Sequence, residues 1–164
     1  MAREIQLTDG LFVSKTDPKG NITYCNKELI SISGFSEREL ISAPHSIIRH
    51  ADMPKTIFKT LWSHVQSGRE IFALIKNKTK SGDFYWAYAN ISPSLDDGAK
   101  IVGYKSIRRK ASQDAIKQIS DFYARLKDAE RADPSKGETF LDEFLAQNKT
   151  SFNEFVVKLQ HKDR

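Results

Sequence analysis

The stretch from Pro44 to Trp62 concentrates side chains that could bind an anion. Its sequence, PHSIIRHADMPKTIFKTLW, places Arg49 and His50 just ahead of a run of apolar residues with helical spacing. Asp52 is a residue type that commonly caps a helix, and Pro54 suits a first helical turn. The first N–H groups of a helix are unpaired and lie at the positive end of its dipole. The stretch therefore predicts an anion site, for example for a pyrophosphate.

Amide and aromatic side chains alternate along two predicted strands. Residues 70–79 place Asn77 on one face together with apolar side chains, and residues 84–92 place Trp86 and Asn90 on one face. Amides can donate to and accept from the polar edge of a planar heterocycle, which aromatic rings can enclose. If the strands pair, Asn77 and Asn90 face a ligand pocket. An ordinary core face with a few polar edges is the alternative.

The sequence offers little for catalysis. It contains neither a G-x-G-x-x-G nor a P-loop motif, and no serine or cysteine has the context of a catalytic triad. The histidines show no metal-ligand spacing, although His45 or His50 could serve as a lone haem ligand. The single cysteine, Cys25, excludes a disulfide framework and suits a reducing compartment. These features predict a protein that is not an enzyme.

Composition limits the class of partner. The chain has 164 residues, which predicts one domain with an appendage, and its net charge is +5. The basic residues are scattered, so we expect no nucleic-acid partner. No apolar run approaches the roughly 20 residues needed to span a bilayer, and the first residues lack a signal peptide. We therefore expect a cytoplasmic protein that does not insert into a membrane.

The order of predicted elements defines the fold class. Two strands come first, then short helices, then the longer helix that follows Asp52 and ends at Gly68, then three strands joined by tight turns. Ser36 begins a capping box that starts one of the short helices. This order predicts an α+β domain in which short helices lie on one face of a five-stranded antiparallel sheet. The predicted strands are 11–16, 21–26, 70–79, 84–92 and 100–108.

A helical extension follows the last predicted strand. Residues 112–131 have the spacing of an amphipathic helix, which either lies on its own sheet or binds a partner. Residues 132–137 are typical of a linker. Two short apolar stretches after it carry four phenylalanines, and they either fold onto the domain or await a partner. The predicted division is a lead at 1–9, a sensor domain at 10–110, a signalling helix at 111–131 and a helical tail at 132–164.

Three segments carry a family resemblance. The element order, the GFSEREL run at 34–40 and the KSGDFYW turn and strand at 80–86 resemble PAS sensor domains. Within that superfamily, IRHADMP at 48–54, followed by Phe58 and Trp62, resembles the FAD-binding PAS domain of aerotaxis receptors. A short chain with one PAS domain is similar to the stand-alone energy-taxis proteins of the CetB type, which work with a separate membrane signalling subunit.

The resemblance implies a PAS fold and non-covalently bound FAD. Residues that match the family motif or line the predicted pocket are the expected FAD-binding set: Asn26, Arg49, His50, Asp52, Phe58, Trp62, Asn77, Trp86 and Asn90. Thr60, Ala51 and Ile71 depart from the aerotaxis pattern. The photoreactive cysteine of the related LOV domains would fall near Ser46, so LOV photochemistry is not expected.

The implied function is redox or oxygen sensing for energy taxis. Reduction of the flavin would change the hydrogen bonds at Asn77 and Asn90, and the sheet or the 112–131 helix would pass the change on. The implied partner is a membrane-bound chemoreceptor signalling protein of the HAMP and methyl-accepting type, which would hold this chain at the periphery of the inner membrane. Whether the chain forms a homodimer is left open by the sequence. The alternatives are a haem or other small-ligand PAS sensor and a cofactor-free interaction module.

Overall fold

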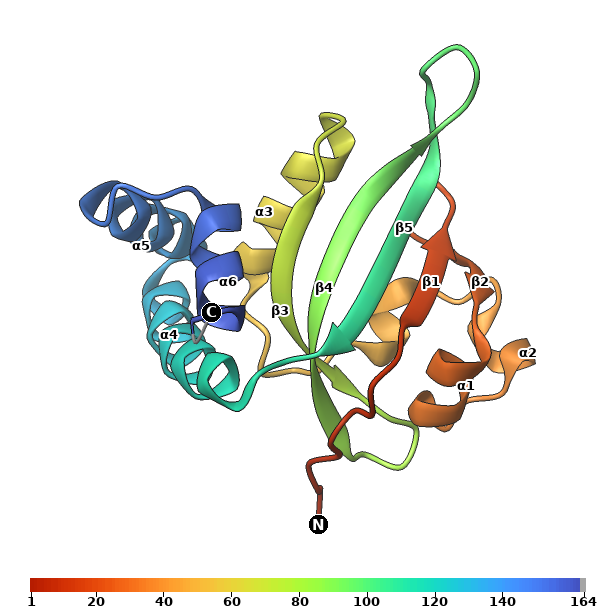
Figure 1. Ribbon diagram of the computed structural model, residues 1–164. Coiled ribbons are helices and arrows are strands. Elements are labelled where there is room, and N and C mark those ends of the chain that lie inside the picture. Colours follow the sequence, from red (N-terminus) through yellow and green to blue (C-terminus); the bar gives the residue numbers. More distant parts are fainter. Residues whose placement is uncertain (163–164) are drawn as a thin grey trace.

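The computed structural model describes residues 1–162, so the last two residues of the predicted 132–164 tail lie outside the described part. Its centre is one antiparallel sheet with the strand order β2-β1-β5-β4-β3 (Figure 1). The strands are β1 (Phe12–Thr16), β2 (Ile22–Cys25), β3 (Ile71–Lys78), β4 (Phe84–Leu95) and β5 (Ile101–Lys110). The predicted α+β class and five-stranded antiparallel sheet are confirmed. β4 continues through Pro93, past its predicted end at residue 92.

Four helical elements connect β2 to β3: the short α1 (Lys27–Ser33), α2 (Glu37–Leu40) and 3₁₀ helix η1 (His45–Ile48), and the longer α3 (Lys55–Gln66). The Ser36 capping box is confirmed, because its side chain accepts from Glu39 N while Glu39 accepts from Ser36 N. In α3, Ile57, Leu61 and Val65 recur every four residues and are buried. This spacing places one apolar stripe of α3 against the sheet.

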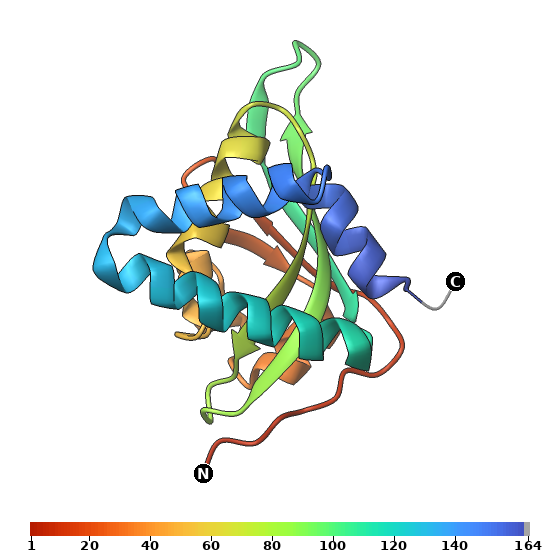
Figure 2. The ribbon, with the colours of Figure 1, turned by 90° about the vertical axis from the view of Figure 1, so that its left-hand side faces the viewer.

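The C-terminal extension covers the other face of the sheet. It consists of α4 (Gln113–Ala132), α5 (Pro134–Gln147) and α6 (Phe152–Gln160), which lie across one side of the sheet in Figure 2. The Tyr123 hydroxyl of α4 donates to the Leu74 carbonyl of β3 at 2.7 Å, and the ring of Phe122 contacts those of Phe144 and Phe155. Of the two alternatives for the 112–131 helix and the tail, the structure shows the folded one.

The predicted linker at 132–137 is wrong. Only Asp133 separates α4 from α5, and its side chain accepts from Ser135 N, so it caps α5. Pro134 occupies the first turn of α5, where its missing N–H costs nothing. The Asp-Pro-Ser composition therefore marks a helix start, and Gly137 lies inside the helix.

Register places the predicted pocket residues on different faces. In an antiparallel sheet, paired residues share a face. Asn77 of β3 pairs with Tyr85 of β4, whereas Asn90 of β4 pairs with Phe72 of β3. Odd-numbered residues of both strands therefore lie on the face of the sheet toward α3, which we call the inner face. Even-numbered residues lie on the face toward α4 and α6, which we call the outer face. The prediction that Asn77 and Asn90 face one pocket is wrong.

Candidate functional site

A cavity lies between the inner face of the sheet and α3. It contains about 700 Å³ free of protein atoms, counting its open mouth, and only about 90 Å³ of this can hold the centre of a water molecule. The cavity is therefore narrow. Its wall includes residues from β1, β3, β4 and β5 on one side and from η1, α3 and the loop between them on the other.

Aromatic side chains of α3 form the apolar side of the cavity. Phe58 and Trp62 lie in the wall, and the Trp62 ring meets Tyr104 of β5 edge to face with 5.3 Å between centroids. Gly20 allows this arrangement, because a Cβ there would approach the Trp62 ring to 3.2 Å and the backbone has a φ of +91°. Such a wall suits an apolar or aromatic ligand surface.

Arg49 connects the loop after η1 to the cavity. Its guanidinium lies over the Phe58 ring, 3.6 Å from the centroid, and burial lowers the pKa of Arg49. The backbone of Arg49 also bridges to that of Asn77, and Asn77 Nδ2 donates to the Ile48 carbonyl at 3.0 Å. These contacts tie the loop to the end of β3 and hold the Arg49 charge at the cavity.

Three polar atoms of cavity residues lack hydrogen-bond partners in the described part of the chain. They are Asn77 Oδ1, Ser106 Oγ and Thr16 Oγ1, and Asn77 is only 2% exposed. The Tyr85 hydroxyl on the same face is also unpaired, and burial raises the pKa of Tyr85 to about 12. An unpaired buried polar group costs about 1–3 kcal/mol. A polar ligand in the cavity would offer partners to these atoms, because their residues line its wall.

This cost can be measured at Ser106. We expect Ser106→Val to raise the free energy of unfolding of the ligand-free protein by about 1 kcal/mol, because it replaces a buried unpaired hydroxyl by one methyl group and adds a second methyl group at the cavity. Urea denaturation measures the change. Ser92→Val on β4 controls for the strand preference of valine. A Ser106→Val protein less stable than the wild type would show that the hydroxyl is paired after all.

A buried arginine forms the deepest polar group. Arg108 of β5 is 2% exposed and donates to three neutral acceptors: His45 Nε2 at 2.7 Å, Ser14 Oγ at 3.1 Å and the Phe12 carbonyl at 3.4 Å. No ion pair in the described residues involves Arg108 or Arg49, and the cavity wall contains no acid. The cavity is therefore positively charged.

His45 is held neutral beside this arginine. Burial, together with the charge of Arg108, lowers the pKa of His45 to about 3. Since a guanidinium can only donate, His45 Nε2 must accept, which assigns the proton to Nδ1. The Nε2 lone pair is thus already used, which argues against His45 as a haem ligand.

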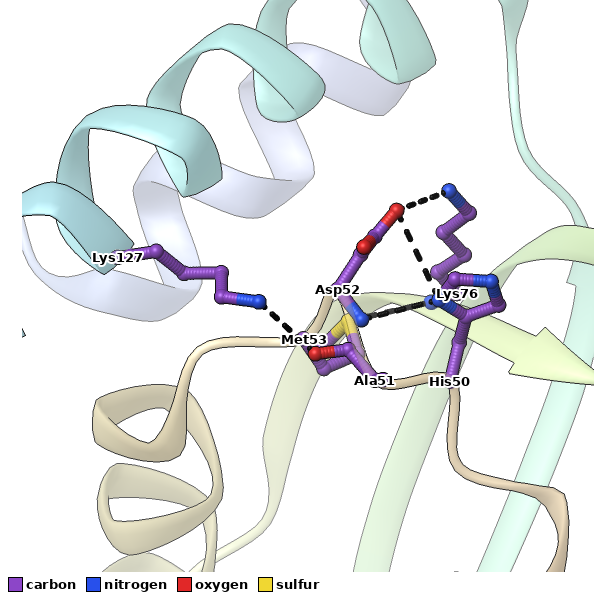
Figure 3. Close-up of polar contacts among 6 residues, drawn as sticks. All are labelled: His50, Ala51, Asp52, Met53, Lys76 and Lys127. Carbon is purple, nitrogen blue, oxygen red and sulfur yellow. Dashed lines mark hydrogen bonds and ion pairs between the residues drawn. The ribbon is translucent and has the colours of Figure 1, made fainter.

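The predicted N-cap at Asp52 is wrong. α3 begins at Lys55, its N-cap position is Pro54, and no side chain there forms a capping bond. Asp52 Oδ2 instead pairs with Lys76 Nζ at 2.7 Å, and Asp52 N donates to His50 Nδ1 at 3.0 Å (Figure 3). The hydrogen bond from Lys76 lowers the pKa of Asp52. Asp52 and His50 therefore shape the loop and do not line the cavity.

An acid from α4 occupies the N-terminus of α3. The backbone N–H groups of Lys55 and Thr56 donate to the Glu130 carboxylate at 3.3 and 2.7 Å, and the Thr56 hydroxyl donates to it as well. Lys127 Nζ donates to the Ala51 carbonyl at 2.9 Å (Figure 3). We call these contacts the α3–α4 clamp. The predicted pyrophosphate site at this terminus is wrong, because the chain's own carboxylate fills it.

Three further predicted residues lie away from the cavity wall. Asn26 caps α1 by accepting from Leu29 N. Asn90 donates to Glu70 on the outer face, and Trp86 lies on that face against α4. Of the expected FAD-binding set, the structure brings together Arg49, Phe58, Trp62 and Asn77.

The inner faces of β1 and β5 supply wall residues that the sequence reasoning missed, namely Ser14, Thr16, Ser106 and Arg108. The sequence indicates His45 only as an alternative haem ligand. The available signal was the spacing of polar residues by two, Ser14 and Thr16 on β1 and Ser106 and Arg108 on β5, which places each pair on one face of its strand. No group of three or more His, Cys, Asp or Glu residues within 1–162 could hold a metal ion. Cys25 lies in a separate apolar cluster.

Comparison with known proteins identifies the class. Residues 22–108 match the family model described as the PAS fold, and the chain belongs to the PAS family. It is 37% identical to the aerotaxis receptor of Escherichia coli over 118 residues, which cover 72% of this chain and 23% of the receptor. It is 25% identical to the biofilm dispersion protein BdlA of Pseudomonas aeruginosa over 61% of this chain and 24% of BdlA. The chain thus spans less than a quarter of these relatives.

Solved structures agree on the fold. A light-oxygen-voltage domain studied with a flavin analogue aligns with a TM-score of 0.61 at 16% identity, covering 70% of this chain and 87% of that domain. A PAS domain from Colwellia psychrerythraea aligns with a TM-score of 0.57 at 21% identity, covering 63% and 87%. The PAS fold is confirmed, and this chain is a member of the PAS family related to the aerotaxis receptor. No helix in residues 1–162 is long and apolar enough to cross a membrane.

Proposed function

We propose that this chain binds FAD and senses redox state or oxygen for energy taxis. The observation that carries the proposal is the set of unpaired polar atoms at Asn77, Ser106 and Thr16, three residues that line a cavity with an aromatic wall. A flavin ring has polar edges that can pair with these atoms and flat faces that aromatic side chains can cover. The relation to the aerotaxis receptor supports the choice of flavin.

Different cavity residues would contact different parts of the ligand. Phe58 and Trp62 would cover the apolar ring surface, and Asn77 would present its free carbonyl oxygen to a donor on the ligand. Arg49 would attract the negatively charged part of FAD. The flavin, when bound, supplies the ability to take up and release electrons. A change in its hydrogen bonding would act on Asn77, which also holds the Ile48 carbonyl.

The signal would leave the domain through α3 and α4. Phe58 and Trp62 belong to α3, and the clamp joins the start of α3 to Glu130 of α4. We propose that the receiver is a membrane-bound chemoreceptor signalling protein of the HAMP and methyl-accepting type. This chain would be cytoplasmic and peripheral at the inner membrane, and it would act without catalysis, as in the stand-alone energy-taxis proteins of the CetB type.

The visible spectrum of the purified chain, with and without added FAD, tests the cofactor. We expect flavin absorption bands that stay with the protein through gel filtration. Asn77→Ala should lose most of the bound flavin, because it removes a polar contact to the ring, whereas Asn90→Ala on the outer face should retain it. Protein that stays colourless in the presence of FAD would refute the proposal, and an intense Soret band would favour haem.

A further inference from the structure

Arg108 carries a charge that no other residue within 1–162 balances. Its three hydrogen-bond partners are neutral, and it is almost fully buried. The titratable groups nearest to it, His45, Tyr85 and Cys25, have pKa values shifted by burial toward their neutral forms at neutral pH. A buried charge without a counter-charge costs several kcal/mol, so folded proteins rarely keep one without a use.

The remaining charges at the cavity have the same sign as Arg108. Arg49 and Lys105 are the other basic residues of the wall, and the wall has no acidic residue. The ion pairs in the described part of the chain lie elsewhere, at Lys59, Lys76, Lys80 and Arg131. Side chains around the cavity therefore cannot supply the missing negative charge.

We infer that the ligand supplies it: Arg108 is the counter-ion of the bound ligand, and the cavity binds the negatively charged form of that ligand more tightly than the neutral form. This inference rests on the proposed function, in which the ligand is a flavin. Arg108 would keep its own proton throughout, because a guanidinium cannot be deprotonated in this range. Its role would be electrostatic.

If the ligand is a flavin, the form that the cavity binds more tightly is the reduced ring. The neutral oxidised ring that takes up two electrons and one proton becomes an anion, and a second proton makes it neutral again. The electrons come from a low-potential donor, which is dithionite in the experiment below. A buried guanidinium beside the ring favours the state that lacks the second proton and raises the affinity for the reduced form. Tighter binding of the reduced form also raises the midpoint potential.

The test is a redox titration of the full chain with FAD at a series of pH values, for the wild type, Arg108→Gln and Arg108→Lys. Arg109→Gln is the matched control, because it removes the same charge from the next residue of β5, which is exposed. We expect Arg108→Gln to lose at least tenfold of the preference for the reduced form, which lowers the midpoint potential of a two-electron couple by about 30 mV. The pH at which the proton uptake per two electrons changes from two to one should lie higher in Arg108→Gln than in the wild type.

Arg108→Lys keeps a positive charge and should retain the proton count of the wild type, so it decides the outcome if the glutamine variant fails to fold. Unchanged potential and proton count in Arg108→Gln, or an equal shift in Arg109→Gln, would overturn the inference while leaving flavin binding intact. A wild-type chain that takes up no FAD would instead refute the proposed function, and this inference with it.

Discussion

Mild acid is expected to destabilise the ligand-free protein by on the order of 2 kcal/mol between pH 6.5 and about pH 5 through His45 alone. Burial lowers the pKa of His45 from 6.5 in the unfolded chain to about 3 in the folded protein. Between these values the unfolded chain binds a proton that the folded protein does not. The contribution of neutral His45 is therefore complete above pH 6.5 and is lost progressively as the pH falls toward 3.

Urea denaturation of the ligand-free chain across this range measures the effect. His45→Gln keeps an acceptor for Arg108 but does not titrate, so its stability should change much less with pH. His161→Gln, in the C-terminal tail, should behave like the wild type. The pKa of His50 is also lowered, mainly by burial, so this ring contributes in the same direction in the wild type and in His45→Gln alike. If the stability of His45→Gln and that of the wild type depend equally on pH, the lowered pKa of His45 is not the cause of the pH dependence.

Local chemistry was sufficient to predict the elements of the fold. The Ser36 capping box and the period-two alternation in β3 and β4 each depend on residues only a few positions apart, and both agree with the structure. The family motif at 48–54 likewise marked the loop that carries Arg49 to the cavity. Such features can be predicted from the sequence because residues close together in the chain determine them.

Contacts between distant segments could not be predicted in the same way. Alternation shows which residues of one strand share a face, but the face shared with the next strand depends on register, and this separates Asn77 from Asn90. Asp52 has the right residue type for a cap but lies two residues before the N-cap position, and the acid that caps α3 is Glu130, 74 residues from Thr56. The neutral acceptors of Arg108 belong to β1 and η1, and no local sequence pattern predicts these contacts.

Glu130→Ala is expected to lower the free energy of unfolding by about 2 kcal/mol. The substitution leaves two N–H groups and the Thr56 hydroxyl without their shared acceptor, and it removes a negative charge from the positive end of the α3 dipole. Urea denaturation with an unchanged m-value would measure the loss. Asp128→Asn on the same helix is the control. Its ion pair with Arg131 is exposed, so the change should stay below about 0.5 kcal/mol.

The clamp should also matter for the ligand, because α3 carries Phe58 and Trp62. If α4 holds the start of α3 in place, Glu130→Ala should weaken FAD binding although Glu130 does not line the cavity, whereas Asp128→Asn should leave it unchanged. Glu130→Gln keeps a carbonyl acceptor without the charge and should fall between wild type and alanine in both measurements. An alanine variant with reduced stability but unaltered FAD affinity would show that the clamp serves folding only.

Gly137→Ala is expected to change stability in the direction opposite to that of an ordinary Gly→Ala substitution in a helix. Replacing a glycine inside a helix by alanine ordinarily stabilises a protein by about 0.5–1 kcal/mol. A Cβ at Gly137 of α5, however, would overlap Thr56 Oγ1 and Glu130 Cγ, so it must push the clamp apart. We therefore expect Gly137→Ala to destabilise the chain and to weaken FAD binding as Glu130→Ala does. If Gly137→Ala is instead more stable than the wild type, α5 does not hold the clamp closed, and the route from cavity to tail must run elsewhere.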